Sequence, residues 1–448
     1  MRDIDHDLIA RRAAPVPRYT SYPTAPNFAA SVGADDYVAL LEGVRDTSSL
    51  SLYLHIPYCH ELCWYCGCNT KAVKRYEPVA RYVATLEREI GMVAAHMTGP
   101  RKVTSIHWGG GSPNVLSAAH IRSLADRVRA RFEIAGGAEI AVEIDPRTLS
   151  VPQVHAFTDT GVNRVSFGVQ DFDPAVQAAI NRMQPFDMTR RAVDLFRDRG
   201  VAAINLDLVY GLPHQTLATA ERTLHQVLRL SPDRIAAFGY AHLPSRLKHQ
   251  RLIETRTLAG PVERFQLSKL IAQTLTGAGY VQIGLDHFAQ PSDPLASRQV
   301  VRNFQGYTTD QATGLIGPGA SAIGRIGDTY FQNATPAGEY IACIDAGRLA
   351  TARGLKLDAE DRLRGFVIER LMCDLQFPGQ ELNSLFGAAA EPVRREAQAL
   401  LAGDSDGLVE RAPGGFRVTD RGRPFIRSWC ARFDSYLQPG TSRHAIGV

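Results

Sequence analysis

The feature that most constrains the fold is a regular alternation, from residue 51 to 284, of short apolar runs with longer helical segments. The runs are rich in Val, Ile, Phe and Tyr, as β-strands are, and the intervening segments repeat apolar residues at spacings of three and four. This pattern is typical of βα units around a parallel sheet. The predicted strands are SLYLHI, VTSIHW, AEIAVEI, RVSFGV, AAINLDLVY, RIAAFGY and YVQIGL.

The loops that follow these strands are polar or rich in Gly and Pro: a cysteine-rich segment, then GGGSPN, DPRTL, QDFDP, GLPHQ and AHLPSR. Any one of them alone would fit an ordinary turn. In a parallel βα barrel, however, the loops at the carboxyl ends of the strands meet around one opening, so distant motifs can share a site. Six or seven units are fewer than the eight of a closed barrel. We therefore expect an α/β fold with an incomplete parallel βα barrel over residues 51–290.

The alternation ends near residue 358, and residues 358–448 are predicted to form a separate, mostly helical domain. EDRLRGFVIERLMCDL, EPVRREAQALLAG and RGRPFIRSWCARFDSYL have helical periodicity, and GLVERAPGGFRVT resembles a hairpin with Pro and Gly in its turn. This order suggests a winged-helix-like domain, but the segment lacks the basic stripe of a DNA-binding surface. Residues 1–50 remain as an N-terminal extension and lid, and residues 291–357 as a substrate-side connecting region.

The charge and hydropathy of the chain indicate an ordinary folded protein of the cytoplasm. A net charge of +4 on 448 residues gives no reason to expect nucleic acid or membrane binding. The sequence contains no apolar run of about 18 residues or more, and its opening lacks the apolar core of a secretory signal. We expect a monomer without a membrane or nucleic-acid partner.

Seven cysteines are present, and four of them lie in the ten residues from Cys59 to Cys68. An odd number does not suit a disulfide framework, and in a reducing compartment such crowding usually indicates a metal. The remaining cysteines stand among apolar neighbours, where a thiol mostly behaves as a small hydrophobic group. We therefore assign Cys343, Cys373 and Cys430 to the core.

Cys59, Cys63 and Cys66 have the spacing to hold one four-iron, four-sulfur cluster through three of its irons, whereas a fully ligated cluster takes four thiolates. The fourth iron is then open to a small molecule. The amino and carboxylate groups of S-adenosylmethionine (SAM) can chelate it, and one electron from the cluster can cleave the sulfonium bond to give a 5′-deoxyadenosyl radical. The spacing thus predicts a radical SAM enzyme.

Structural zinc is the alternative, but a zinc ribbon needs two cysteine pairs separated by a dozen or more residues, and no second pair occurs. Cys68 leaves three interpretations open. It could be a fourth ligand, a thiol of the substrate pocket or a packing residue. Because only Gly67 separates it from Cys66, however, the two thiols are too close in the chain to bind the same cluster comfortably.

Three further motifs are placed to complete the site. Gly109–Gly111 in HWGGGSP expose backbone to a ligand and suit the methionine end of SAM, although a glycine triplet also suits a tight turn. Glu143 and Asp145 end the third strand, where a carboxylate can bind ribose hydroxyls or an amino group. Because Asp145 precedes Pro146 and fits a turn, we favour Glu143. Gln170, Arg182 and Asp207 stand at or just beyond later strand ends.

The chain resembles the oxygen-independent coproporphyrinogen III oxidases over nearly its whole length. The resemblance implies oxidative decarboxylation of the propionates on rings A and B of coproporphyrinogen III to vinyl groups, which gives protoporphyrinogen IX in haem biosynthesis. It also implies one 4Fe-4S cluster and two SAM molecules. The matching stretches are PRYTSYPTAP, LHIPYCHELCWYCGCN, HWGGGSP, EIDPR, GVQDF, NLDLVYGLP, FGYAHLP, DHFA and NFQGYTT.

By the same resemblance, Cys68 and Tyr53 are catalytic candidates, and Cys68 is a site residue rather than a cluster ligand. The implied SAM-binding positions are Tyr53, Tyr65, Gly110, Gly111, Ser112, Glu143, Gln170, Arg182, Asp207, Ala241 and Ile323. Two departures stand out. Tyr65 occupies a position where Phe is often found, and the stretch between DHFA and NFQGY is a few residues short, which affects local substrate contacts.

The resemblance predicts a substrate with four carboxylates, which a nearly neutral protein must meet with a few placed bases. Arg suits this best because its planar guanidinium pairs with a carboxylate bidentately. Our candidates are Arg18, in the N-terminal element, and Arg302, beside NFQGYTT, although an ion pair within the protein is an equal alternative for Arg302. The segment from Arg18 to Thr24 is the candidate lid that shields the radical.

Two other functions fit a cysteine loop of this kind: a haem-binding or carbon-transferring relative, and a non-catalytic iron–sulfur protein. Haem chaperones of this kind generally lack the N-terminal PRYTSYPT element and a matching NFQGYTT, and an electron-transfer protein needs no open iron. We therefore favour the oxidase. It requires a low-potential electron donor such as flavodoxin or ferredoxin, which the sequence does not identify.

Overall fold

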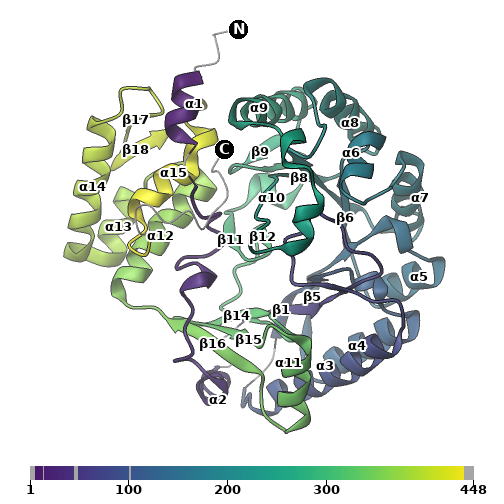
Figure 1. The fold of residues 1–448 in the computed structure, drawn as a ribbon. Helices are drawn as coiled ribbons and strands as arrows, with labels where there is room; N and C mark the ends of the chain where they lie inside the picture. Colours follow the sequence, from purple (N-terminus) through teal and green to yellow (C-terminus); the bar gives the residue numbers. More distant parts are fainter. Residues whose placement is uncertain (1–5, 14, 45–48, 100–101, 438–448) are drawn as a thin grey trace.

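The computed structural model describes residues 6–13, 15–44, 49–99 and 102–437, and its centre is one twelve-stranded sheet (Figure 1). The strands from β13 to β8 run parallel to their neighbours, and those beyond them on either side are antiparallel. In spatial order the strands are β16 (Thr351–Lys356), β15 (Thr329–Asn333), β14 (Ile323–Ile326), β13 (Gly314–Ile316), β1 (Leu50–Ile56), β4 (Lys102–Gly110), β5 (Glu133–Ile144), β6 (Arg164–Gln170), β7 (Ala203–Tyr210), β8 (Arg234–Gly239), β10 (His287–Ala289) and β9 (Val281–Ile283).

The order has two open edges, β16 and β9, so the predicted incomplete parallel βα barrel is confirmed in its main features. One prediction about it is wrong. YVQIGL was expected to supply a parallel strand, but its strand, β9, pairs antiparallel with β10, and β10 pairs antiparallel with β8. The chain reverses at Gly284, whose φ of +53° suits a tight turn, and this hairpin places β10 between β9 and β8.

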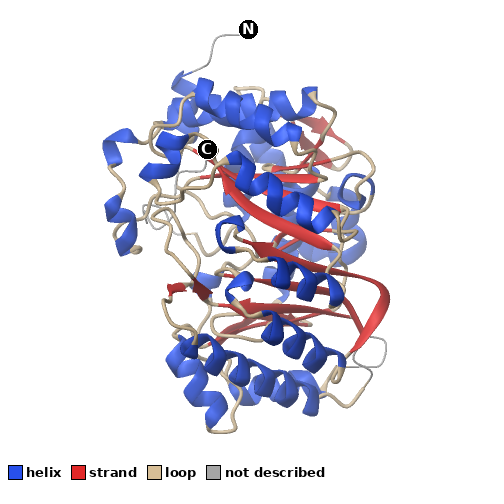
Figure 2. Ribbon diagram, turned by 90° about the vertical axis from the view of Figure 1, so that its right-hand side faces the viewer, coloured by secondary structure: helices blue, strands red, loops and turns tan. Residues whose placement is uncertain are grey.

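Helices pack around the sheet, as Figures 1 and 2 show. They form because apolar residues recur on one face; in α3 (Glu77–Ala95), Val79, Val83, Leu86 and Ile90 are all buried. The others along the barrel are α4 (Ala118–Arg129), α5 (Val151–Asp159), α6 (Pro174–Ala179), α7 (Phe186–Arg197), α8 (Leu217–Arg229), α9 (Pro261–Gly277), α10 (Pro294–Ser297) and α11 (Ala337–Asp345).

The inner strands place apolar and polar residues on opposite faces. In β6, Val165, Phe167 and Val169 are buried, whereas the alternate residues from Arg164 to Gln170 are only partly buried. Side chains along a strand alternate between the two faces of a sheet, so the buried set packs under the helices and the polar set faces inward. The inner face of the sheet is therefore available for a site.

The carboxyl-terminal part is mostly helical, as predicted. It contains α12 (Ala359–Asp374), α13 (Gly379–Phe386), α14 (Glu391–Ala402), the hairpin of β17 (Val409–Ala412) and β18 (Gly415–Val418), and α15 (Ile426–Cys430). Cys373 and Cys430 are buried in this part and Cys343 is half-buried on α11, in agreement with a packing role.

The N-terminal segment packs against this helical part (Figure 1). Leu8 and Ile9 of α1 (His6–Arg12), together with Tyr19 and Tyr22, share a core with its helices. The helix α2 (Ala34–Glu42) follows. Residues 291–357 supply β13 to β16 of the central sheet as well as the small ribbon of β11 (Val301–Asn303) and β12 (Gly306–Thr308), and the four-part division of the chain stays a prediction.

None of the helices in the described ranges combines the length and the apolar character needed to cross a membrane.

Candidate active site

A cavity of about 750 Å³ on the inner face of the sheet brings together nearly all the residues predicted for the site. They come from the carboxyl ends of successive parallel strands and the loops beyond, which the topology directs to one opening. The predicted residues that line it are Tyr53, Cys59, Cys63, Tyr65, Cys66, Cys68, Gly110, Gly111, Ser112, Glu143, Gln170, Arg182, Asp207 and Ala241.

Ile323 is the exception among the predicted binding positions. It does not line this cavity, because β14 lies beyond β13, away from the strands that form the site. Its half-buried side chain packs on the small apolar cluster of Phe28, Tyr330 and Leu357. The structure therefore does not bring the Ile323 side chain to the other predicted residues.

The cysteine loop is held in place by contacts from distant segments. Gln250 donates from Nε2 to the carbonyl oxygen of Tyr65 at 3.0 Å, and Nε2 of His249 lies 2.7 Å from the carbonyl oxygen of Cys66. Asn181 donates to the carbonyl oxygen of Leu62 at 3.1 Å. These contacts satisfy carbonyl groups that the irregular backbone leaves without partners, and so they set the direction of the thiols.

The sulfur of Cys63 faces two guanidinium groups. Nη2 of Arg147 lies 3.3 Å and Nη1 of Arg182 lies 3.4 Å from Sγ. Both arginines also bind the carboxylate of Asp145, with Arg147 Nη2 at 2.7 Å, and together they hold the pKa of Asp145 low, at about 2, against the opposing effect of burial. Nη1 of Arg147 also lies 3.5 Å from the carboxylate of Glu61, so two carboxylates match the two guanidinium groups, and what these offer the sulfur of Cys63 is hydrogen-bond donors.

Cys66 and Cys68 interact with each other. The backbone N–H of Cys68 donates to Sγ of Cys66 at 3.4 Å. A hydrogen bond from the Cys68 thiol is the main cause that lowers the pKa of Cys66, to about 7, and the same bond raises the pKa of Cys68 well above its ordinary value. The pair thus favours a thiolate at Cys66 and a protonated thiol at Cys68, and the assignment of Cys66 alone as a cluster ligand stays a prediction.

The donor set fits an iron–sulfur cluster. Cys59, Cys63 and Cys66 all line the same cavity, with Cys59 Sγ 3.2 Å from Oγ1 of Thr70. Burial raises the pKa of Cys59 to about 12, so a cation that displaces its proton is needed for it to act as a thiolate. Over the described ranges, no three His, Cys, Asp or Glu side chains converge closely enough for a single ion.

The glycine triplet brings backbone close to the cysteine loop. Gly110 has a φ of +111°, which favours glycine, and a Cβ on Gly111 would lie 2.5 Å from the carbonyl oxygen of Tyr58. The backbone N–H groups of Gly111 and Ser112 donate to the carbonyl oxygens of Ile56 and Tyr58, at 2.8 and 2.9 Å. Larger residues would separate this loop from the cysteine loop.

Glu143 lies between a histidine and the glycine loop. Its Oε1 is 2.9 Å from Nε2 of His107, and its Oε2 accepts from the backbone N–H of Gly110 at 3.3 Å. The ring of Tyr53 stacks on His107 with centroids 5.8 Å apart, and burial, with the nearby charge of Glu143, raises the pKa of Tyr53 well above its ordinary value. Tyr53 is therefore a neutral phenol.

Asp207 lies in a polar network deeper in the cavity. It accepts hydrogen bonds from Ser166 Oγ and from Asn205 Nδ2, each at 2.8 Å, and burial raises its pKa. Beside it, Gln170 adopts a left-handed backbone with a φ of +68°. Such a φ is uncommon outside glycine, and at a cavity it is a mark of a functional position.

Sequence analysis predicted residues at the carboxyl ends of the strands and missed those that lie earlier along the same strands. The cavity is also lined by Ser105, His107, Glu139, Arg164, Ser166, Asn205, Arg234 and His287. Their signal was a polar residue at every second position, as in Ser105 and His107 or Arg164 and Ser166, which marks an inner strand face that does not pack into the core.

Arginines line the cavity in two different states. Four of them are ion-paired with carboxylates of the protein: Arg147, Arg164, Arg182 and Arg234. Arg18 instead donates to the carbonyl oxygen of Gly239 at 2.6 Å, and no ion pair is recorded for the exposed side chain of Arg246 within the described chain. Arg18 and Arg246 are thus the cavity arginines available to an external anion.

Arg302 does not line the cavity, so the structure does not bring this candidate to the other predicted residues, and its contact with a substrate carboxylate stays a prediction. Its guanidinium stacks on Tyr307 at 4.3 Å and donates to the backbone oxygens of Tyr19 and Arg18, at 3.1 and 3.5 Å. Arg302 therefore holds the N-terminal segment that carries Arg18.

Comparison with known proteins reveals similarity over the whole chain. Residues 53–227 match the radical SAM superfamily and residues 357–425 match the HemN C-terminal domain. The chain is 46% identical over 437 residues to the oxygen-independent coproporphyrinogen III oxidase of Bradyrhizobium diazoefficiens, with 97% of each chain covered.

Two further relatives extend the comparison. The oxygen-independent coproporphyrinogen III oxidase of Pseudomonas aeruginosa is 41% identical, covering 97% of this chain and 96% of that protein. The solved coproporphyrinogen III oxidase (HemN) of Escherichia coli, described as a radical SAM enzyme, superposes with a TM-score of 0.90 at 38% identity, covering 97% of this chain and 99% of that one.

Proposed function

The chain belongs to the oxygen-independent coproporphyrinogen III oxidases, a family of radical SAM enzymes, and from this premise we propose how its residues carry out the reaction. The enzyme converts coproporphyrinogen III to protoporphyrinogen IX in haem biosynthesis, without oxygen, by oxidative decarboxylation of two propionates to vinyl groups. It uses a 4Fe-4S cluster and SAM. The observation that carries the residue assignment is the convergence of the predicted residues on one cavity.

Cys59, Cys63 and Cys66 hold the cluster in this proposal. When bound, the cluster supplies the electron that cleaves SAM to the 5′-deoxyadenosyl radical, which abstracts a hydrogen atom from a propionate. Arg147 and Arg182 orient Cys63 through their contacts with Sγ. Cys68 keeps its proton, at the cavity wall, where a thiol can donate a hydrogen bond or a hydrogen atom.

The SAM molecules lie against the glycine loop and the inner strand ends. Gly110, Gly111 and Ser112 offer backbone to the methionine end, and the partly exposed carboxylate of Glu143 suits an amino or hydroxyl group. Gln170, Arg182, Asp207 and Ala241 line the rest of the same cavity, which supports two molecules as in the family.

Arg18 and Arg246 bind carboxylates of the substrate. Both line the cavity without a carboxylate partner in the described chain, whereas the other arginines there are paired. A guanidinium can bind a carboxylate through two parallel hydrogen bonds. Arg302 contributes indirectly, because it holds the backbone of Arg18 in place.

The N-terminal segment from Arg18 to Thr24 shields the site. Tyr19 donates from its hydroxyl to Asp434 at 3.0 Å, and the hydroxyl of Tyr22 lies 2.9 Å from Oγ of Ser435. Both rings are buried. These anchors keep the segment over the cavity edge, where it excludes water from the radical.

We further propose that a low-potential donor such as flavodoxin or ferredoxin supplies the electron, and that the enzyme acts as a monomer in the cytoplasm. All seven cysteines are free of disulfides, in agreement with a reducing compartment.

An anaerobic assay tests the proposal. The protein reconstituted with iron and sulfide, given SAM, a reductant and coproporphyrinogen III, should form 5′-deoxyadenosine, carbon dioxide and protoporphyrinogen IX. Cleavage of SAM with no loss of carbon dioxide would show that the substrate is a different one.

A further inference from the structure

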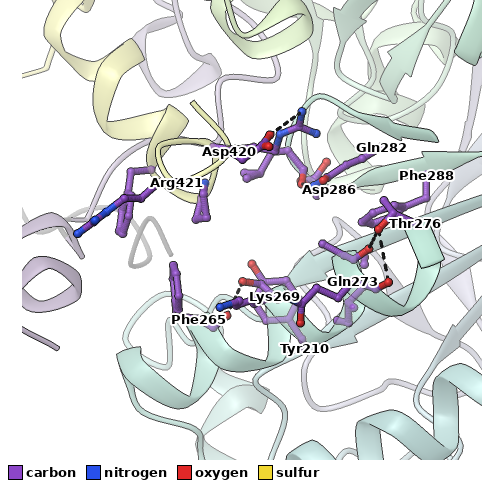
Figure 3. A pocket seen from close by; sticks show the side chains of 18 of the residues that line it. Tyr210, Phe265, Lys269, Gln273, Thr276, Gln282, Asp286, Phe288, Asp420 and Arg421 are labelled. Atoms are coloured by element: carbon purple, nitrogen blue, oxygen red, sulfur yellow. Dashed lines mark hydrogen bonds and ion pairs between the residues drawn. The ribbon is translucent and has the colours of Figure 1, made fainter. Parts of the chain in front are cut away.

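Figure 3 shows a second cavity, of about 830 Å³. It lies on the opposite face of the sheet from the candidate active site. Neighbouring residues of the same strands line the two cavities. Ala237 and Phe288 line this one, and Phe238 and His287 line the active site. Since successive side chains of a strand point to opposite faces, the two cavities are separated by the thickness of the sheet.

The walls of this second cavity combine apolar rings with bases. Phe265 of α9 stacks on Phe425 with centroids 5.9 Å apart, at 18°. Figure 3 shows Lys269 and Tyr210 on the side of Phe265, and Asp420 and Arg421 across from them. An apolar wall with a few charged groups is typical of a site for an amphipathic ligand.

Arg427 is the least satisfied of these charged groups. Its side chain lies on α15, the residue is 8% exposed, and it lines the cavity. Within the described chain its Nε is buried without a hydrogen-bond partner, and no hydrogen bond or ion pair is recorded for its other nitrogens. A buried guanidinium in this state costs free energy that a bound anion would recover.

The acids that face Arg427 are already engaged. Asp286 lies 2.8 Å from Nδ1 of His287, and this contact, with the charges of Arg302 and Arg427, offsets burial and holds the pKa of Asp286 at about 2. Asp420 lies 3.9 Å from Nη2 of Arg423. Within the described chain neither carboxylate is within ion-pair distance of Arg427, so neither forms a direct salt bridge with it.

The charges that line the cavity set the kind of ligand. Four bases, Lys269, Arg421, Arg423 and Arg427, face two acids, Asp286 and Asp420. The excess of two positive charges beside aromatic rings suits an apolar molecule with two carboxylates. The volume lies within the range of about 300–1,000 Å³ that is usual for small-molecule sites.

We propose that the second cavity binds a dicarboxylate tetrapyrrole, the class to which the reaction product belongs, with one carboxylate paired to Arg427. The choice of a tetrapyrrole rests on the proposed function, since the product retains two of the four carboxylates of the substrate. The cavity is then a product-side site, separate from the cavity that holds the cluster.

The test is a binding titration of the anaerobically reconstituted enzyme with protoporphyrin IX, an air-stable stand-in for the product, followed by absorbance and by thermal shift. Arg427→Gln should weaken binding roughly tenfold or more, the loss expected for one charge-assisted contact. Arg417→Gln, the same change at an exposed, ion-paired arginine of β18, should leave binding unchanged. Arg246→Gln distinguishes the two cavities, because it should lower only the affinity of porphyrin that binds in the active site.

Two further ligands test whether binding requires the carboxylates of the porphyrin or any apolar carboxylate. Protoporphyrin IX dimethyl ester should bind the wild type no better than protoporphyrin IX binds Arg427→Gln, and palmitate should not displace the porphyrin. Equal binding of the ester, or displacement by palmitate that depends on Arg427, would overturn the proposal. An equal loss in Arg246→Gln would also overturn it, because the porphyrin would then occupy the active site.

Stability distinguishes a binding role from a structural one. Without ligand, Arg427→Gln should melt at or above the temperature of the wild type, since an unpaired buried charge is removed. A lower melting temperature together with unchanged porphyrin affinity would make Arg427 structural. Turnover of coproporphyrinogen III by the wild type, measured separately, tests the proposed function and does not depend on these titrations.

Discussion

Arg147 donates a hydrogen bond from Nη2 to the sulfur of Cys63 at 3.3 Å, while the same nitrogen binds Asp145 at 2.7 Å. Hydrogen bonds to a ligand sulfur stabilise the more negative, reduced state of an iron–sulfur cluster. We expect Arg147→Ala to retain the cluster and to make its midpoint potential more negative. Redox titration followed by electron paramagnetic resonance measures this.

Arg190→Ala is the control for this change, because Arg190 is an exposed arginine whose ion pair with Asp187 stays on the surface of α7. The midpoint potential of the cluster in Arg190→Ala should equal that of the wild type. A potential unchanged in Arg147→Ala would show that the hydrogen bond to Cys63 has no electronic effect.

The cluster ligands are tested by iron content. Replacement of Cys59, Cys63 or Cys66 by Ser, one at a time, should lower iron below about four per chain and abolish SAM cleavage, because a cluster with three protein thiolates has no spare ligand. Cys343→Ser, at a half-buried thiol on α11, is the control. Full iron in the triple variant would contradict the assignment.

Cys68 is predicted to behave differently from its neighbours. Because the contact from Cys68 to Sγ of Cys66 comes from its backbone N–H, which Ser keeps, Cys68→Ser should retain iron and SAM cleavage. Decarboxylation should fall, which the carbon dioxide released per 5′-deoxyadenosine measures. If Cys68→Ser lost as much iron as Cys66→Ser, Cys68 would have to be a ligand.

Arg18→Ala and Arg246→Ala should each raise the KM for coproporphyrinogen III roughly tenfold or more. This is the loss for one charged hydrogen-bonded contact of about 1.5–3 kcal/mol. Uncoupled SAM cleavage should be unchanged, since neither arginine lies at the cysteine loop. Normal turnover at subsaturating substrate in both variants would remove them from the site.

Arg302→Ala is expected to act through the fold. It removes two hydrogen bonds to the backbone of the N-terminal segment and the stacking on Tyr307, at a cost of about 1–3 kcal/mol. The measurement is chemical denaturation of the reconstituted protein beside Arg18→Ala, which should be closer to the wild type in stability. Equal stability of wild type and Arg302→Ala would rule out this structural role.

Glu89 should make stability depend on pH. It is buried on α3 and accepts from Tyr340, Asn333 and Gly319, yet burial outweighs these bonds and raises its pKa from 4.5 to about 7. The folded state therefore retains a proton that the unfolded state releases between about pH 4.5 and 7. This contribution, about 3 kcal/mol, is complete below pH 4.5 and is lost as pH rises toward 7.

Glu89→Gln removes the titrating group, so the decline in melting temperature between pH 4.5 and 7 should be smaller in the variant than in the wild type. Other carboxyls titrate in both proteins, and the difference between the two curves isolates Glu89. Parallel curves across this range would mean that Glu89 has an ordinary pKa.

Much of the fold followed from local pattern. The six runs that became β1 and β4 to β8 were recognisable because strands buried under helices are apolar and rich in branched residues. The hairpin of β9 and β10 was not recognisable as an antiparallel edge. YVQIGL has the composition of any buried strand, and pairing depends on which strand is left without a neighbour when the sheet is assembled.

The sequence by itself determined the chemistry of this protein, because the spacing of Cys59, Cys63 and Cys66 and the order of the strand-end motifs are local properties of the chain. Only the tertiary structure decided which charges remain available. The resemblance offered Arg18 and Arg302 alike as substrate-binding candidates and did not single out Arg427. In the structure Arg18 reaches into the active-site cavity, Arg302 holds backbone, and the Nε of Arg427 is buried without a partner. The physical reason is that the partners of an arginine decide whether its charge is neutralised, and those partners come from segments hundreds of residues away.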